Sequence, residues 1–215
     1  MRVLLLGATG PSGILIIHEF FKAYPDGTLI IYARNPSKLR SQIISNPSIT
    51  IIKGELTDTD SLITTFTSTS SQPKIDAVLS TLGPAFGHPS TLPLTRAYDT
   101  LIPIMAAHGY KRDKFSILAC ILVTIVWLIQ RNAYNDIVAY SKGIASNCDE
   151  YAIDWTLVRV LSLNNRKVQK LVVGYVGDGR TGVGLSRFAM AQFYVGEIEG
   201  SGWVRKAPAL SSKVP

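Results

Sequence analysis

A glycine-rich turn near the start of the chain constrains its fold more than any other feature of the sequence. The turn carries Gly7, Gly10 and Gly13 in a G-x-x-G-x-x-G pattern. An apolar run at 2–6, typical of a strand, precedes it, and apolar positions at helical spacing follow it over 14–23. In this setting the first glycine permits a tight turn, the second lets the backbone approach a pyrophosphate, and the third lets the helix pack on the sheet. The pattern therefore predicts a dinucleotide-binding turn.

Further groups of this turn can bind phosphate. The N-terminus of a helix offers free N–H groups and the positive end of the helix dipole. Thr9 and Ser12 can add hydroxyl donors. An ordinary glycine-rich turn is the alternative, but the flanking strand and helix favour cofactor binding. We expect the cofactor to contact Gly7, Thr9, Gly10, Pro11, Ser12 and Gly13.

The end of the second predicted strand indicates which dinucleotide is bound. An NAD site usually has a carboxylate here, about 20 residues after the glycines, for the ribose 2′-hydroxyl. This chain has no acidic residue at that point, but Arg34 stands at the strand end and Lys38 follows in the next predicted helix. A guanidinium group matches a 2′-phosphate, so the pair favours NADP(H), unless both are solvated surface residues.

Strands and helices alternate along the whole chain. The apolar runs predict strands at 2–6, 28–33, 49–53, 75–80 and 155–160. The helical patterns predict helices at 14–23, 36–44, 58–66, 94–109 and 186–199, with Ser186 as the N-cap of the last. Of the 215 residues 47 % are hydrophobic, which suits one domain with a large core. We expect a single α/β domain over 1–215, a Rossmann-type doubly wound parallel sheet.

Charge and cysteine content exclude several other classes of protein. The formal net charge of +7 comes from scattered residues, which predicts a solvated basic surface and no nucleic-acid partner. The apolar stretch 117–129 is too short to span a membrane and predicts a buried segment. Cys120 and Cys148 have neither disulfide-scaffold nor metal-site spacing, so we expect reduced core residues in a cytoplasmic protein. Oligomeric state is left open.

The motifs together resemble the NmrA-like, atypical short-chain dehydrogenase family, especially fungal NAD(P)-binding oxidoreductases related to the flavin and biliverdin reductases. The resemblance rests on the glycine turn and on residues 33–39, 54–57 and 80–83, and it extends through 132–160 and 179–182. It implies that Glu55 and Leu56 lie beside the adenine. It also implies that the nicotinamide ribose is lined by Ser80, Thr81, Leu82 and Gly83. Both stretches follow predicted parallel strands, where open α/β sheets bind ligands.

Two features depart from that resemblance. Short-chain dehydrogenases use a Tyr four residues before a Lys for proton transfer. Here Val138 stands four residues before Lys142, and Tyr140 is only two before it, so the two side chains should lie on different sides of a helix. A fifth strand is also missing at its expected place after 111–112: either 115–126 supplies it or the chain carries a deletion.

The sequence leaves three functions open and names no catalytic residue. The first is an NADP(H)-dependent oxidoreductase acting on a small organic substrate. The second is an NADP(H)-binding sensor or regulatory protein without turnover, and a weaker third is an isomerase. We expect an intact cofactor half, residues 1–110, and an altered substrate half, residues 111–215, with weak turnover.

Overall fold

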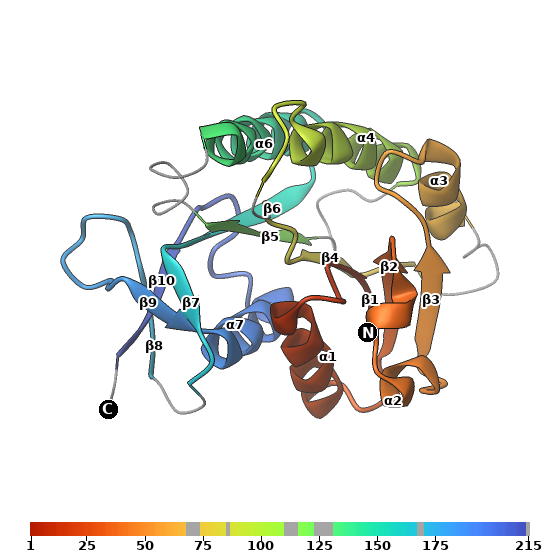
Figure 1. Ribbon diagram of the computed structural model, residues 1–215, viewed down its shortest axis with the longest axis horizontal. Helices are drawn as coiled ribbons and strands as arrows, with labels where there is room; N and C mark the ends of the chain where they lie inside the picture. Colours follow the sequence, from red (N-terminus) through yellow and green to blue (C-terminus); the bar gives the residue numbers. More distant parts are fainter. Residues whose placement is uncertain (68–73, 85–86, 110–115, 123–130, 167–169, 214–215) are drawn as a thin grey trace.

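The computed structural model describes residues 1–67, 74–84, 87–109, 116–122, 131–166 and 170–213. The described chain forms an eight-stranded sheet between two layers of helices (Figure 1). In order across the sheet, the strands are β3 (Ile49–Lys53), β2 (Thr28–Ala33), β1 (Arg2–Leu6), β4 (Ala77–Ser80), β5 (Ser116–Leu122), β6 (Asp154–Val160), β10 (Ala209–Lys213) and β8 (Lys170–Gly174). All neighbours pair in parallel except β10 and β8. The predicted Rossmann-type sheet is confirmed.

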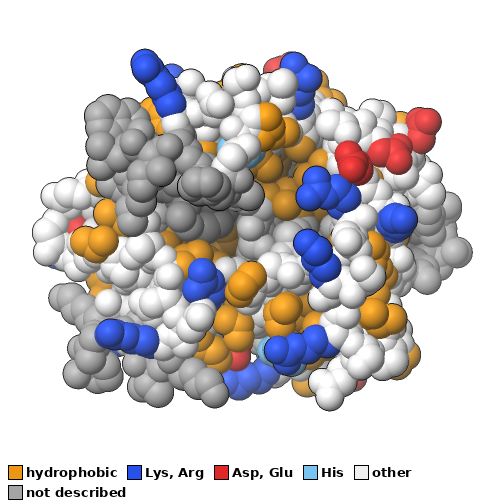
Figure 2. Space-filling model, in the orientation of Figure 1, with side chains coloured by type: hydrophobic (Ala, Val, Ile, Leu, Met, Phe, Trp, Pro, Cys, Tyr) orange, Lys and Arg blue, Asp and Glu red, His pale blue; other side chains and the backbone are white. Residues whose placement is uncertain are grey.

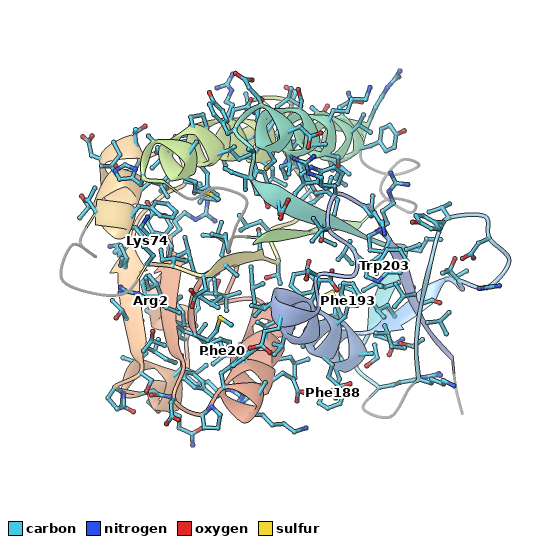
Figure 3. All side chains as sticks on the ribbon, turned by 180° about the vertical axis from the view of Figure 1, so that it is seen from behind. Arg2, Phe20, Lys74, Phe188, Phe193 and Trp203 are labelled. Atoms are coloured by element: carbon cyan, nitrogen blue, oxygen red, sulfur yellow. The ribbon has the colours of Figure 1, made fainter. Side chains whose placement is uncertain are left out.

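Helices cover both faces of the sheet. The helices α1 (Pro11–Ala23) and α7 (Arg187–Gly200) pack on one face; α3 (Thr59–Thr67), α4 (Pro93–Ala107) and α6 (Arg131–Glu150) lie on the other. On β1, Val3 belongs to the first core and Leu4 to the second, because successive side chains of a strand point to opposite faces. Phe20 of α1 and Phe193 of α7 are both buried in the first core (Figure 3).

The question of the fifth strand is answered by β5. Ser116–Leu122 pairs in parallel with β4 on one side and with β6 on the other. The apolar segment 115–126 therefore supplies the strand, and the alternative of a deletion is wrong. A sheet in this order needs a strand between β4 and β6, since each would otherwise leave an edge of N–H and C=O groups unpaired. Residues 123–130, which follow β5, lie outside the described residues.

One predicted helix is wrong in detail. The expected helix at 36–44 is a 3-10 turn, η1 (Pro36–Lys38), followed by a short helix, α2 (Ser41–Ile44). Between them Leu39 and Arg40 have extended backbone angles, with ψ of 147° and 149°. The break turns the Leu39 side chain into the first core, where it is 5 % exposed, so burial outweighs helical continuity.

Smaller predictions on helices, cysteines and charge have mixed outcomes. Tyr140 is buried, with its ring centroid 5.4 Å from that of Tyr98, whereas Lys142 is exposed, so the two do lie on different sides of α6. Cys148 is fully buried, and burial raises the pKa of its thiol to about 12; the side chain of Cys120 is outside the described part.

Figure 2 shows lysine and arginine side chains spread over one face of the molecule. Among the described helices none combines the length and apolarity needed to cross a bilayer.

The C-terminal part adds elements that were not predicted. Strands β7 (Ser162–Asn164) and β9 (Gly184–Ser186) form a small parallel pair. Directly after β9, Ser186 is the N-cap of α7, as predicted: its hydroxyl accepts hydrogen bonds from the N–H groups of Phe188 and Ala189. The same hydroxyl donates to the carbonyl of Arg166, which joins α7 to the β7 side of the molecule.

We predict that Ser186→Ala lowers the free energy of unfolding by about 1 to 2 kcal/mol, since a buried cap and its acceptor both lose a partner. Urea denaturation measures the change. Ser45→Ala is the control, because Ser45 is exposed and its hydroxyl bonds only to the Ser41 carbonyl, 3.0 Å away. Equal losses in the two variants would contradict the role of the cap.

Candidate functional site

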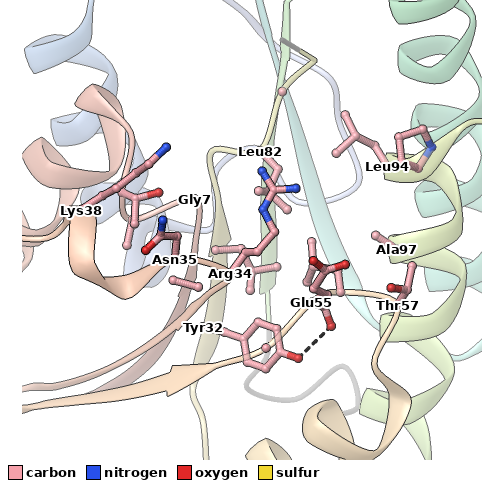
Figure 4. A pocket seen from close by; sticks show the side chains of 18 of the residues that line it. Gly7, Tyr32, Arg34, Asn35, Lys38, Glu55, Thr57, Leu82, Leu94 and Ala97 are labelled. Atoms are coloured by element: carbon pink, nitrogen blue, oxygen red, sulfur yellow. Dashed lines mark hydrogen bonds between the residues drawn. The ribbon is translucent and has the colours of Figure 1, made fainter. Parts of the chain in front are cut away.

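A cavity of about 500 Å³ opens at the carboxyl ends of β1, β2, β3 and β4 (Figure 4). This is the edge of an open α/β sheet at which ligands bind. Its walls come from the β1–α1 turn, the ends of β2 and β3, and the segment from β4 into α4. Of the residues predicted to bind the cofactor, those that line the cavity are Gly7, Thr9, Arg34, Lys38, Glu55, Leu56, Leu82 and Gly83.

The β1–α1 turn is built by close backbone contacts. Gly7 has a φ of +81°, and a side chain there would meet the Thr81 hydroxyl at 2.5 Å. A side chain on Gly13 would collide with the carbonyl of Gly7 and with Ala8. Gly10 differs: its φ of −85° is ordinary, and a Cβ there would lie 3.4 Å from the nearest heavy atom, the Gly7 oxygen. Gly7 and Gly13 are therefore required by the fold, whereas the space beside Gly10 is open.

Helix α1 begins at this turn with Gly10 as its N-cap and Pro11 in its first turn. The N–H groups of Ser12 and Gly13 have no acceptor within the helix, as at every helix start. These residues and Gly10 are not part of the cavity wall itself; they lie beside it, next to Thr9. The turn thus offers N–H groups and a helix dipole to an anion that extends out of the cavity along α1.

Two cations stand at the end of β2. Arg34 and Lys38 line the cavity, and both are exposed. In Figure 4 the Arg34 side chain reaches into the space between Asn35 and Leu82. Neither cation forms an ion pair with an acidic residue in the part of the chain that the structure describes. The pair is therefore available to a negatively charged ligand.

The end of β3 is fixed against β2. The Tyr32 hydroxyl donates to the backbone carbonyl of Glu55 over 2.8 Å, as the dashed line in Figure 4 shows. Burial of the Tyr32 phenol and the charge of Asp58 raise its pKa, so it keeps the proton that it donates. A side chain on Gly54 would collide with the Tyr32 ring. These contacts hold Glu55 and Leu56 in the wall of the cavity.

At the end of β4, Ser80 and Thr81 lie behind the cavity wall. The Ser80 hydroxyl is buried and lies 2.7 Å from that of Tyr98, and the Ser80 carbonyl accepts from Tyr194. The Thr81 hydroxyl donates to the carbonyl of Gly7 over 3.2 Å. Both residues thus join β4 to its surroundings, and the next two, Leu82 and Gly83, form the wall.

Sequence reasoning missed a histidine and a buried carboxylate on the β4 side. His88 lines the cavity, and its Nε2 lies 2.7 Å from a carboxylate oxygen of Asp136 on α6. Asp136 is fully buried and also accepts hydrogen bonds from the N–H groups of Leu94 and Thr95 and from the Thr95 hydroxyl. Burial by itself would raise the pKa of Asp136, but the bonds from Thr95, His88 and Leu94 outweigh it and lower the pKa. The sequence could have indicated His88, because it lies in a glycine-rich loop after a predicted strand. Nothing in the sequence indicates that Asp136, 48 residues further along the chain, is its partner.

Asp136 therefore caps a helix other than its own. Leu92, the residue before α4, has a left-handed φ of 52° and supplies no side-chain cap. The N-terminal N–H groups of α4 bond instead to a carboxylate that lies 42 residues away in sequence. An ionised carboxylate is favourable at this end of the helix dipole. The cap holds Leu94, which lines the cavity, in place at the start of α4.

Comparison with known proteins agrees with this geometry. Residues 7–200 match the family described as NAD(P)H-binding. The chain belongs to this NAD(P)H-binding family. No curated protein matches it. The site that binds the dinucleotide in such a fold lies where the cavity is, at the carboxyl ends of the strands.

Solved structures share the fold. A Rossmann-fold NAD(P)-binding family protein from Shigella flexneri superposes with a TM-score of 0.74 at 15 % identity, over 100 % of this chain and 96 % of that one. A wide-type short-chain dehydrogenase/reductase from Veillonella parvula DSM 2008, in complex with NADP, gives 0.75 at 13 % identity, covering 98 % and 94 %. A candidate NADH-flavin reductase from Streptococcus pneumoniae gives 0.65 at 16 % identity, covering 99 % and 100 %.

Substitutions of the second and third glycines of the turn should have different effects. Gly10→Val suits the extended backbone at that position and should cost about 1 kcal/mol of stability or less, while its side chain blocks the approach of a pyrophosphate. Gly13→Ala should cost about 1 to 3 kcal/mol or more, because its Cβ meets backbone atoms. Thermal unfolding and fluorescence titration with NADPH measure the two effects. A Gly10→Val protein that binds NADPH normally would contradict the site.

Proposed function

We propose that the chain is an NADP(H)-dependent oxidoreductase that acts on a small organic substrate. The observation that carries the proposal is that Arg34 and Lys38 line the cavity after β2 and form no ion pair with any of the described acidic residues. No acidic residue stands at that strand end to accept a ribose 2′-hydroxyl. A guanidinium fork and an ammonium group suit a 2′-phosphate.

The residues of the cavity fit the two ends of an adenosine group. Leu56, after β3, provides an apolar contact for a base, and the cations lie at the β2 side of the same cavity. The turn at Gly10 then receives the pyrophosphate at the start of α1. A bound reduced nicotinamide supplies a hydride, and the protein supplies binding, orientation and electrostatics. The finer resemblance, to NmrA-like atypical short-chain dehydrogenases, is part of this proposal.

An NADP(H)-binding sensor without turnover is the second candidate. It is favoured by the arrangement of α6, where Tyr140 is buried against Tyr98 and Lys142 points elsewhere, so no Tyr–Lys pair is formed. The regular pairing of β5 favours the enzyme, because the sheet on the substrate side is continuous up to β6. Loss of NADPH absorbance with a panel of quinones, flavins and carbonyl compounds separates an enzyme from a sensor.

We predict that Arg34→Ala weakens NADPH binding by about 1 to 3 kcal/mol, the range of a hydrogen bond to a charged group, and leaves NADH binding almost unchanged. Isothermal titration with both cofactors measures the difference. Arg40→Ala is the matched control, because Arg40 is also exposed but lies outside this cavity. Equal losses for NADPH and NADH would show that Arg34 does not contact the 2′-phosphate.

A further inference from the structure

His88 stands in the connection between β4 and α4 and lines the cavity with a side chain that is only 7 % exposed. We propose that His88 is a catalytic residue, which gives a proton to the oxygen of a carbonyl substrate as that substrate is reduced, and that Asp136 is the residue that positions it. This inference rests on the proposed reductase function and names its substrate class.

The hydrogen bonds of Asp136 fix which nitrogen of His88 carries a proton. A carboxylate has about four lone-pair directions and, when ionised, only accepts. The Oδ1 atom of Asp136 accepts two hydrogen bonds from Thr95, one from its N–H group at 2.9 Å and one from its hydroxyl at 2.6 Å. The Oδ2 atom accepts a hydrogen bond from the Leu94 N–H group at 2.9 Å and lies 2.7 Å from Nε2 of His88. Nε2 must therefore be the donor. This leaves Nδ1 as the nitrogen that can gain and lose a proton, and it has no partner among the described residues.

The strand order places His88 and the two cations on opposite sides of its switch point. A bound dinucleotide lies across the switch point of the strand order, here between β1 and β4. The cations after β2 mark the adenosine side, so the nicotinamide half extends toward β4 and β5. His88 follows β4, and Asp136 lies on α6, the helix after β5.

The other titratable residues of the cavity wall are less suited to this step. Arg34 and Lys38 stand after β2 and Glu55 after β3, on the adenosine side. The Tyr32 hydroxyl is held by the Glu55 carbonyl. Among the lining residues that the structure describes, His88 is the one titratable group on the β4 side. Since α6 carries no Tyr–Lys pair, a different proton donor is needed.

The step balances with NADPH as the reductant. The substrate carbon accepts a hydride, the C–O π bond breaks, and its electron pair moves to the oxygen. That oxygen takes the proton from Nδ1 of the His88 imidazolium, so an alcohol is formed. The Asp136 carboxylate keeps the ring in place through Nε2–H, and the neutral ring regains a proton from water. General acid catalysis of this kind contributes about 100- to 10,000-fold to a rate.

The test compares His88→Gln with His18→Gln. Glutamine at position 88 keeps an N–H donor for Asp136 but cannot carry the proton, whereas His18→Gln makes the same change at an exposed histidine of α1 that does not line this cavity. We expect His88→Gln to bind NADPH within about twofold of the wild type and to reduce 9,10-phenanthrenequinone about 100-fold more slowly or worse in single turnovers. His18→Gln should retain both NADPH binding and the rate.

Imidazole ¹⁵N NMR gives a readout that does not depend on turnover. The chain has three histidines, so His18 and His108 serve as internal references. His88 should show the Nε2–H tautomer in the wild type and should lose it in Asp136→Asn. An Nδ1–H tautomer would overturn the positioning role of Asp136.

The outcomes separate this inference from the proposed function. A wild type that does not bind NADPH overturns both. A wild type that binds NADPH but leaves the quinone unreduced overturns the catalytic role of His88 and favours the sensor. Quinone reduction by His88→Gln at the wild-type rate overturns the inference alone and leaves the reductase in place.

Discussion

The site depends on one close packing contact, between the β1–α1 turn and the end of β4. Gly7 takes a left-handed backbone at φ +81°, and its carbonyl accepts the Thr81 hydroxyl while it faces the backbone at Gly13. A side chain at either glycine would push α1 away from the sheet. The contact therefore sets where α1 begins and how far it lies from β4. The cavity occupies the edge that this contact defines.

The wall of the cavity on the β4 side depends on a second interaction, the hydrogen bonds of Asp136. Asp136 of α6 caps α4, so two helices on the same face of the sheet are tied at the point where the cavity begins. Because the folded protein lowers the pKa of Asp136 from its usual 3.8, this carboxylate adds stability above that pH, and the contribution is lost as the pH falls through the lowered value. The wall on this side is thus held by a carboxylate that is ionised at neutral pH.

The sequence predicted the parts of the molecule that are specified locally. Strands β1, β2 and β3 have the predicted ends, because a parallel strand buried on both faces is a continuous apolar run between polar turns. Arg34 and Lys38 line one cavity because both stand close together in sequence at the end of β2. In contrast, the break at Leu39 depends on a core that only the folded chain forms.

Long-range features were beyond the reach of sequence patterns. His88 and Asp136 are 48 residues apart and meet only through the packing of α4 on α6. The short strands β7 and β9 have three residues each, too few for a periodic signal, and they pair across 21 residues or more. The sequence could not decide between a strand and a helix for the segment that forms β5, because its apolar run suits both.

The most direct test of cofactor binding, and of a preference for the 2′-phosphate, is thermal unfolding of the wild-type protein. The melting temperature is measured with NADPH, with NADH and without cofactor. A ligand that binds only the folded state stabilises it by mass action, by about 2.7 kcal/mol at a hundred times its Kd. We predict a larger rise in Tm with NADPH than with NADH at equal concentration. No rise with either cofactor, or a larger rise with NADH, would contradict it.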